Sequence, residues 1–131
     1  MVCLDTSFAI DLIRGEKKII SLEKRLDEGD EEITITTPSV MELSRGAKLS
    51  NKPQTEKEKV LQFLYSLIIL DLNKESAILA GEIEADLRKR GEIIDTEDIM
   101  IAAIAIKNNE TLLTRNVKHF ERIKDLKIES Y

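Results

Sequence analysis

Three acidic side chains stand beside strongly apolar stretches of this sequence. Asp5 follows an apolar opening, Glu42 lies between two apolar neighbours, and Asp98 precedes an almost wholly apolar run. A carboxylate at the edge of a buried segment is costly unless something compensates it. If these segments pack side by side, the acids repel each other by about 4 kcal/mol per pair at about 4 Å and an effective dielectric of about 20. A divalent cation relieves that repulsion, so the pattern predicts a metal site.

The elements that must position these acids alternate between strand and helix. Short β-branched or apolar segments predict strands at Val2–Asp5, Ile33–Thr36, Leu67–Leu72, Thr111–Thr114 and Lys127–Ser130. Apolar residues at helical spacing predict helices in the segments between them, including one over Glu16–Asp27. This alternation predicts a single α/β domain over residues 1–131, with a mostly parallel central sheet of about four to five strands and helices on both faces.

One rim of such a sheet is a natural meeting place for the polar residues. Parallel α/β sheets place ligand sites outside the carboxyl ends of their strands. Asp5 and Asn116 follow predicted strands and fall directly at this rim. Glu42 and Asp98 fall in helices that begin near it. The sequence therefore predicts that these four side chains share one site.

Capping residues predict where the helices begin and end. The expected N-caps are Thr37 before Pro38, Thr55 in a segment resembling a capping box, Asn73, Asp95 or Thr96, and Asn116. Gly15 and Gly91 are expected to end the helices that precede them.

Composition narrows the class of protein. The chain has 131 residues, of which 42% are hydrophobic and 34% charged, which is typical of a folded soluble domain. It has neither a membrane-spanning apolar run nor a signal-peptide pattern, and its only cysteine, Cys3, is expected to be a buried thiol. These features predict a cytoplasmic protein with no membrane partner. A single histidine, His119, argues against zinc sites built from several His or Cys ligands.

The net charge of −5 disfavours binding to nucleic acid if the charge is evenly spread. However, the basic residues are clustered around Arg14, Arg45, Arg88 and Arg115. Any one cluster is ordinarily a solvated helix face. Clusters that flank the acids are of more interest, because a phosphate group needs both the metal and the cations.

Four motifs in succession resemble those of PIN-domain nucleases. They are Leu-Asp-Thr-Ser at 4–7, Ser-Val-Met-Glu-Leu-Ser-Arg-Gly-Ala at 39–47, Asp-Ile-Met-Ile-Ala-Ala-Ile-Ala at 98–105 and Leu-Thr-Arg-Asn-Val-Lys-His-Phe at 113–120. In order and spacing they are most similar to the VapC-type toxins of toxin–antitoxin pairs, over essentially the whole chain. The resemblance implies a small parallel-sheet fold and RNA cleavage dependent on Mg²⁺ or Mn²⁺. It also implies a homodimer and a cognate antitoxin that blocks the site.

The resemblance also assigns roles to residues. The first three acids of the family fall on Asp5, Glu42 and Asp98, which would hold the metal. The fourth position, often Asp in the family, is Asn116, so one negative charge is missing and the number of metal ions stays open. The supporting positions are Thr6, Ser7 and Thr114, with Asp95 as a candidate to compensate for the missing charge.

The implied chemistry is hydrolysis of a phosphodiester bond. A hard cation such as Mg²⁺ prefers oxygen ligands, polarises a phosphoryl oxygen and activates a bound water for in-line attack. Either Glu42 or Asp98 would orient or deprotonate that water. The candidates to bind the flanking RNA phosphates are Arg115, Arg14 and Arg45.

Three other interpretations remain open at this stage. A phosphoacceptor receiver domain is also a parallel α/β domain with an acidic metal pocket, and Asp71 at the end of an apolar segment could be its phosphorylated residue. It would need adjacent acids after the first strand, where this chain has Thr6-Ser7. The other two are a PIN-type nuclease of RNA maturation and a PIN-fold interaction module without catalysis, which Asn116 alone supports.

Overall fold

The structure is a computed structural model that describes residues 1–15 and 32–131. The helix predicted over Glu16–Asp27 lies outside these residues. Among the described helices, none is long and apolar enough to span a membrane.

Five parallel strands form one sheet at the centre of the molecule. They are β1 (Val2–Leu4), β2 (Ile33–Thr36), β3 (Ile68–Leu70), β4 (Thr111–Leu113) and β5 (Lys127–Glu129). Their order is β3-β2-β1-β4-β5, and all four pairs are parallel, so the predicted sheet is confirmed. β1 is the middle strand, with Leu4 aligned with Ile35 of β2 and with Leu113 of β4.

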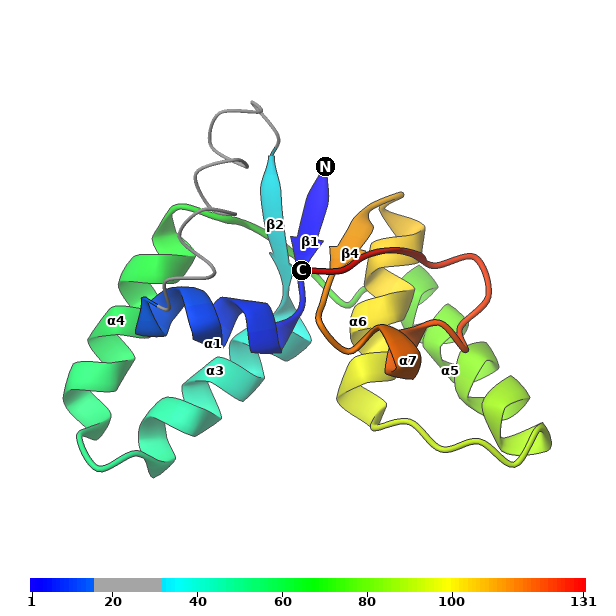
Figure 1. The fold of residues 1–131 in the computed structure, drawn as a ribbon, viewed down its shortest axis with the longest axis horizontal. Coiled ribbons are helices and arrows are strands. Elements are labelled where there is room, and N and C mark those ends of the chain that lie inside the picture. The colour runs from blue at the N-terminus through cyan, green and yellow to red at the C-terminus, as the bar shows by residue number, and fades with distance from the viewer. Residues whose placement is uncertain (16–31) are drawn as a thin grey trace.

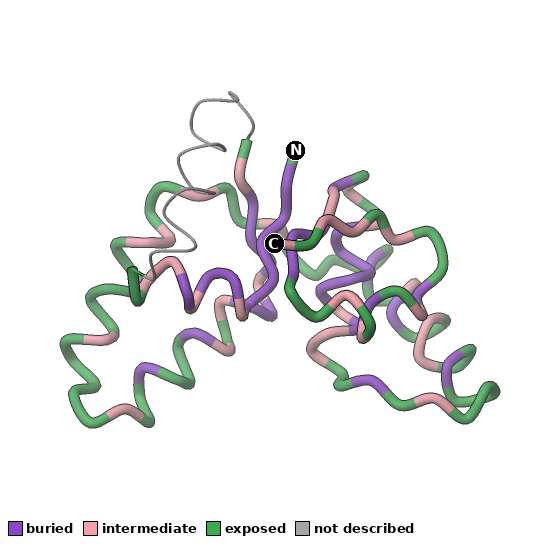
Figure 2. Tube along the Cα trace, in the orientation of Figure 1, coloured by how far each residue is buried: buried purple, intermediate pink, exposed green. Residues whose placement is uncertain are grey.

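Helices cover both faces of this sheet, as the alternation predicts (Figure 1). One face carries α1 (Thr6–Arg14), α3 (Thr37–Leu49) and α4 (Pro53–Tyr65). The other carries α5 (Lys74–Lys89), α6 (Thr96–Lys107) and α7 (Val117–Phe120). Figure 2 shows that buried residues concentrate in the three inner strands β1, β2 and β4 and in parts of the helices around them, whereas the edge strands β3 and β5 are largely exposed or half-buried.

The side chains of β1 alternate between the two layers. Leu4 packs with Phe8 of α1, whereas Cys3 packs with Ile101 and Ala102 of α6. All of these side chains are fully buried. The prediction that Cys3 is a packed apolar thiol is confirmed, and burial raises the pKa of this thiol to about 12.

Several helix starts differ from those predicted. The cap of α3 is Thr36, whose Oγ1 accepts a hydrogen bond from the backbone N–H of Ser39 at 3.3 Å, so the predicted Thr37 is off by one residue. α4 begins at Pro53, two residues before the predicted capping box at Thr55. Proline suits the first turn because its missing N–H would have no partner there.

Other caps lie where they were predicted. Asn73 caps α5 through a reciprocal pair of hydrogen bonds with Ser76. Gly15 and Gly91 follow α1 and α5 with positive φ values of 68° and 72°. Asp95 and Asn116 occupy the N-cap positions of α6 and α7, but neither side chain makes a capping hydrogen bond.

The topology brings three helix N-termini to one rim of the sheet. α1 and α3 start directly after β1 and β2. α6 runs back toward the start of β4, so its N-terminus lies at the same rim (Figure 1). The carboxyl ends of β1 and β4 lie side by side there, since these strands are paired.

Candidate active site

Asp5 is the most deeply buried of the predicted acids, with 3% of its surface exposed. It directly follows β1, at the N-cap of α1, and accepts three hydrogen bonds. The Thr6 backbone N–H donates to Oδ1 at 2.8 Å, while the hydroxyls of Ser7 and Thr114 donate to Oδ2 at 3.0 and 2.7 Å. These donors compensate the buried carboxylate for the lost water. They also leave few of its lone pairs free.

Glu42 reaches the same rim from α3. Its Oε1 accepts a hydrogen bond from the Thr6 hydroxyl at 2.7 Å, and that hydroxyl is also hydrogen-bonded to the buried Ser39 hydroxyl at 2.8 Å. Burial raises the pKa of Glu42, and the nearby charges of Glu97 and Asp5 raise it further. The Thr6 hydrogen bond and the Arg45 guanidinium oppose this rise.

Asp98 lies in the first turn of α6. Its pKa is raised to about 7, chiefly by burial and then by the charges of Asp5 and Glu42. One of its oxygens, Oδ2, lies 3.1 Å from Nδ1 of His119 on α7. Asp98 is thus crowded by like charges on one side and contacts an imidazole on another.

The three acids therefore converge from three elements that are far apart in sequence. Asp5 and Glu42 both raise the pKa of Asp98, so the three side chains are close enough to repel each other. Within residues 1–15 and 32–131, however, no three His, Cys, Asp or Glu side chains form a ready-made metal cage. The donor set still fits Mg²⁺, because this ion keeps several waters and needs only one or two protein carboxylates.

Two further predicted residues lie exposed beside the acids. Asp95 precedes α6, and its charge contributes to the raised pKa of Asp98. Asn116 is held through its backbone, because its N–H donates to the Thr114 hydroxyl at 3.0 Å. Thr114 therefore connects Asn116 to Asp5.

The predicted arginines differ in their surroundings. Arg45 lies 4.0 Å from Glu42 and 3.7 Å from Glu97, so it is part of the acidic cluster. Arg115 forms an ion pair of 3.0 Å with Asp11, a fully buried acid of α1, although half of its side chain stays exposed. Arg14 is exposed at the end of α1.

Comparison with known proteins identifies the family. The sequence model of the PIN domain matches residues 2–126. Ribonuclease VapC2 of Rickettsia felis is 31% identical over 98% of this chain and 96% of its own length. Ribonuclease VapC1 of Methanocaldococcus jannaschii is 34% identical over 99% of this chain and 86% of its own length. The chain belongs to the PIN-domain family of VapC ribonucleases.

Solved structures of this family show the same fold. VapBC2 of Rickettsia felis, bound to a DNA fragment from the promoter, aligns with a TM-score of 0.91 at 30% identity and covers 100% of this chain and 99% of the other. DNA-bound VapBC of Salmonella typhimurium aligns with a TM-score of 0.90 at 31% identity, over 98% and 96% of the two chains. Membership of the PIN family removes the receiver-domain interpretation, and Asp71 lies exposed at the end of the edge strand β3.

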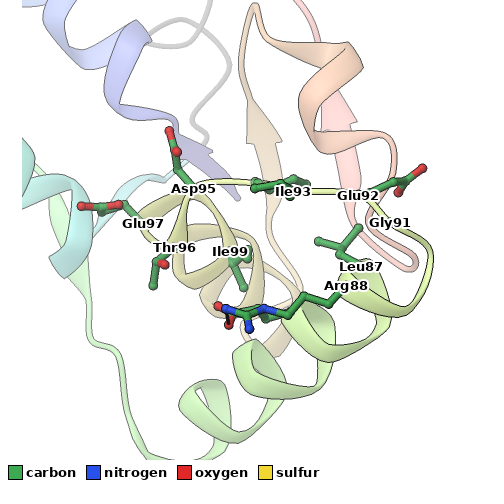
Figure 3. A pocket seen from close by; sticks show the side chains of 11 residues that line it. Leu87, Arg88, Gly91, Glu92, Ile93, Asp95, Thr96, Glu97 and Ile99 are labelled. Atoms are coloured by element: carbon green, nitrogen blue, oxygen red, sulfur yellow. Dashed lines mark ion pairs between the residues drawn. The ribbon is translucent and has the colours of Figure 1, made fainter.

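Two hollows lie near the acidic site of this PIN domain, and Glu42 lines the smaller of them. A cavity of about 660 Å³ lies between the end of α5 and the start of α6 (Figure 3). Leu87 and Ile99 contribute apolar surface to it, whereas Asp95 and Glu97 add acidic groups beside the site. A smaller, mainly apolar groove of about 170 Å³ lies between α1, α3 and α4, and Glu42 is one of the residues that line it. Its lining includes Ile10, Ile13, Leu43, Gly46 and Val60.

Some neighbours of the acids were not predicted as site residues. From the sequence, His119 was noted only as the single histidine, which argues against zinc sites, and as part of the motif at 113–120, yet it contacts Asp98. His119 comes three residues after Asn116, and positions i and i+3 share a helix face. This spacing could have indicated that His119 lies on the side of the helix that faces the site. Ser39 and Asp11 carried no such signal, because their partners, Thr6 and Arg115, come from elements distant in sequence.

Proposed function

We propose that this protein is a metal-dependent endoribonuclease that cleaves RNA phosphodiester bonds with an activated water, and that it is the toxin of a toxin–antitoxin pair. The observation that carries this proposal is the convergence of Asp5, Glu42 and Asp98 at the carboxyl rim of the sheet. It occurs in a chain that matches curated VapC ribonucleases over nearly its full length.

The three acids would hold the cation, with Glu42 and Asp98 having more free acceptor capacity than Asp5. Bound Mg²⁺ or Mn²⁺ supplies Lewis-acid polarisation of the phosphate and a water of lowered pKa. Glu42 or Asp98 would orient the attacking water, and the Thr6 hydroxyl fixes Glu42 through its 2.7 Å hydrogen bond. Ser7 and Thr114 hold Asp5 in place, while the exposed Asn116 is suited to donate to a phosphate oxygen.

RNA phosphates would be bound by arginines around the acids. Arg115 is the best prepared for this, because Asp11 fixes one edge of its guanidinium while the exposed part keeps free N–H donors. Arg45 stands beside Glu42 and can neutralise a phosphate close to the acids. Arg14 lies farther along α1, next to the groove that Glu42 helps to line.

The proposed antitoxin follows from the relatives and from the groove. The two solved complexes above contain a VapB partner by their names. In this chain the apolar groove between α1, α3 and α4 is lined in part by Glu42, so a peptide lying in it would cover an acid of the site. An antitoxin with apolar side chains matching this groove would block RNA cleavage.

We also propose a homodimer and a cytoplasmic location, where RNA substrates are found. Leu61 and Tyr65 of α4 are 56% and 94% exposed, which leaves apolar surface for a second copy. Light scattering on the purified chain tests this, and a monomer at all concentrations would contradict it.

The direct test is cleavage of a pooled RNA library. We expect fragments with Mg²⁺ or Mn²⁺, and none with EDTA or with the Asp98→Asn variant. One library member is a formyl-methionine initiator tRNA, because a Salmonella typhimurium relative with 31% identity is named as a tRNA(fMet)-specific endonuclease. Equal cleavage in EDTA would overturn the metal-dependent mechanism.

A further inference from the structure

The segment after β4 contacts two of the three acids. Thr114 donates to Oδ2 of Asp5 at 2.7 Å and accepts the N–H of Asn116 at 3.0 Å. Three residues later, Nδ1 of His119 lies 3.1 Å from Oδ2 of Asp98. Residues 114–119 thus connect the end of β1 with the first turn of α6.

The position of His119 is set by its neighbours. Its ring packs edge-on against Phe120, with centroids 5.7 Å apart, and Phe120 is fully buried. The carbonyl oxygen of His119 accepts a hydrogen bond from Arg122 Nε at 3.4 Å. The His119 and Asp98 side chains are 30% and 20% exposed, so their contact is partly shielded from water.

Asp98 needs such a contact if it is to stay beside the other acids. Asp5 and Glu42 repel it, and rotation of its side chain toward solvent would relieve that repulsion. In the described part of the chain, no other Lys, Arg or His side chain has a nitrogen within 4.0 Å of the Asp98 carboxylate oxygens. A proton on Nδ1 lets the imidazole donate to the carboxylate and oppose this rotation.

We propose that His119 is a positioning residue of the acidic site, which holds the Asp98 carboxylate beside Asp5 and Glu42 in the orientation that takes up a divalent cation. This inference rests on the proposed function and adds to it a residue that touches neither RNA nor the reacting atoms. Residues that hydrogen-bond to metal ligands typically contribute about 10–100-fold to metal affinity.

The test compares three variants of the whole chain. His119→Leu keeps an apolar side chain but removes the donor, whereas His119→Asn keeps an N–H close to the place of Nδ1. Lys118→Leu is the matched control, because Lys118 is an exposed neighbour on the same helix. The melting temperature of each is measured against Mn²⁺ concentration without RNA, at one fixed pH.

We expect His119→Leu to raise the midpoint Mn²⁺ concentration by about 10-fold or more. His119→Asn should restore most of this loss, and Lys118→Leu should not change the midpoint. In RNA cleavage at saturating metal, His119→Leu should lower kcat and leave KM unchanged. In an Asp98→Asn background, His119→Leu should cause no further shift in midpoint, because its action passes through Asp98.

The possible outcomes separate this inference from the proposed function. If His119→Leu leaves the midpoint Mn²⁺ concentration unchanged or lowers it, the inference alone is overturned. It is also overturned if His119→Asn raises that midpoint as much as His119→Leu does. If Mn²⁺ does not raise the melting temperature of the wild-type chain, both the inference and the metal-dependent mechanism fail. If the midpoints shift as expected but the wild-type chain cuts no RNA, the inference stands and the proposed function fails.

Discussion

The buried carboxylates of this site differ in how far their surroundings compensate them for lost water and for repulsion by other acids. Asp5 is buried, and three hydrogen bonds to its carboxylate compensate it for the lost water. Asp98 has no comparable set of donors in the described structure, and its pKa is raised to about 7. In the metal-free site the unfavourable electrostatics are therefore concentrated at Asp98, and a bound cation would stabilise this carboxylate most.

Removing the charge of Asp98 should separate function from stability. We expect Asp98→Asn to abolish metal-dependent RNA cleavage. It should also raise the free energy of unfolding of the metal-free protein by up to about 1 kcal/mol, which is the size of an interaction between partly exposed charges. Asp71→Asn is the control, because Asp71 is an exposed acid at the end of the edge strand. Cleavage assays and thermal unfolding in EDTA measure both effects, and full cleavage by Asp98→Asn would refute its role.

The raised pKa of Asp98 also predicts how stability depends on pH. In EDTA, Asp98 keeps its proton up to about pH 7 in the folded state, because its pKa is raised to about 7, whereas in the unfolded state it loses the proton near its ordinary pKa of 3.8. Because the folded state binds more protons over this interval, the free energy of unfolding contributed by Asp98 falls as the pH rises. Denaturant unfolding between these pH values should show this decline in the wild-type chain and a weaker one in Asp98→Asn. Identical slopes would contradict the assignment.

At the level of helices and strands, the central elements followed most directly from the sequence. β1 and α6 are apolar nearly throughout, and only a central position buries such segments. Helix starts were less predictable, since Pro53 and Thr55 both offer a plausible first turn to α4 and packing decides between them. Ile78 is an apolar residue of α5, yet 54% of its surface is exposed, so the apolar spacing of a helix does not by itself tell which positions are buried.

The groove beside α3 allows a test of the proposed antitoxin interaction. A Cβ added at Gly46 would meet no atom of another element within 4 Å, so alanine fits there without strain. Gly46→Ala should raise the free energy of unfolding by about 0.5–1 kcal/mol, because glycine weakens a helix interior. Gly46→Phe should also fold and cleave RNA, but its ring should fill the groove and weaken antitoxin binding.

Binding assays with the antitoxin measure this effect, and Gly46→Ala serves as the matched control. If Gly46→Phe binds the antitoxin as tightly as Gly46→Ala does, the partner does not occupy this groove.

At the level of the whole molecule, strand order explains why the acidic cluster was predictable. Once Asp5 and Thr114 follow neighbouring parallel strands, they must share a rim, and the helices bearing Glu42 and Asp98 begin there. The contact of His119 with Asp98 was not predictable in the same way. It depends on how α7 packs against α6, which the alternation of elements does not specify.

The proposed toxin role makes a prediction for the living cell. Expression of this chain alone should arrest growth, because unrestrained cleavage of RNA stops protein synthesis, whereas Asp98→Asn expressed at the same level should not. Co-expression of the proposed antitoxin should restore growth by covering the acidic site. A nuclease of RNA maturation would instead be tolerated when expressed alone, and its loss would leave unprocessed RNA precursors. Growth curves and RNA sequencing of both strains distinguish the two roles, and normal growth with an active, soluble chain would rule out the toxin.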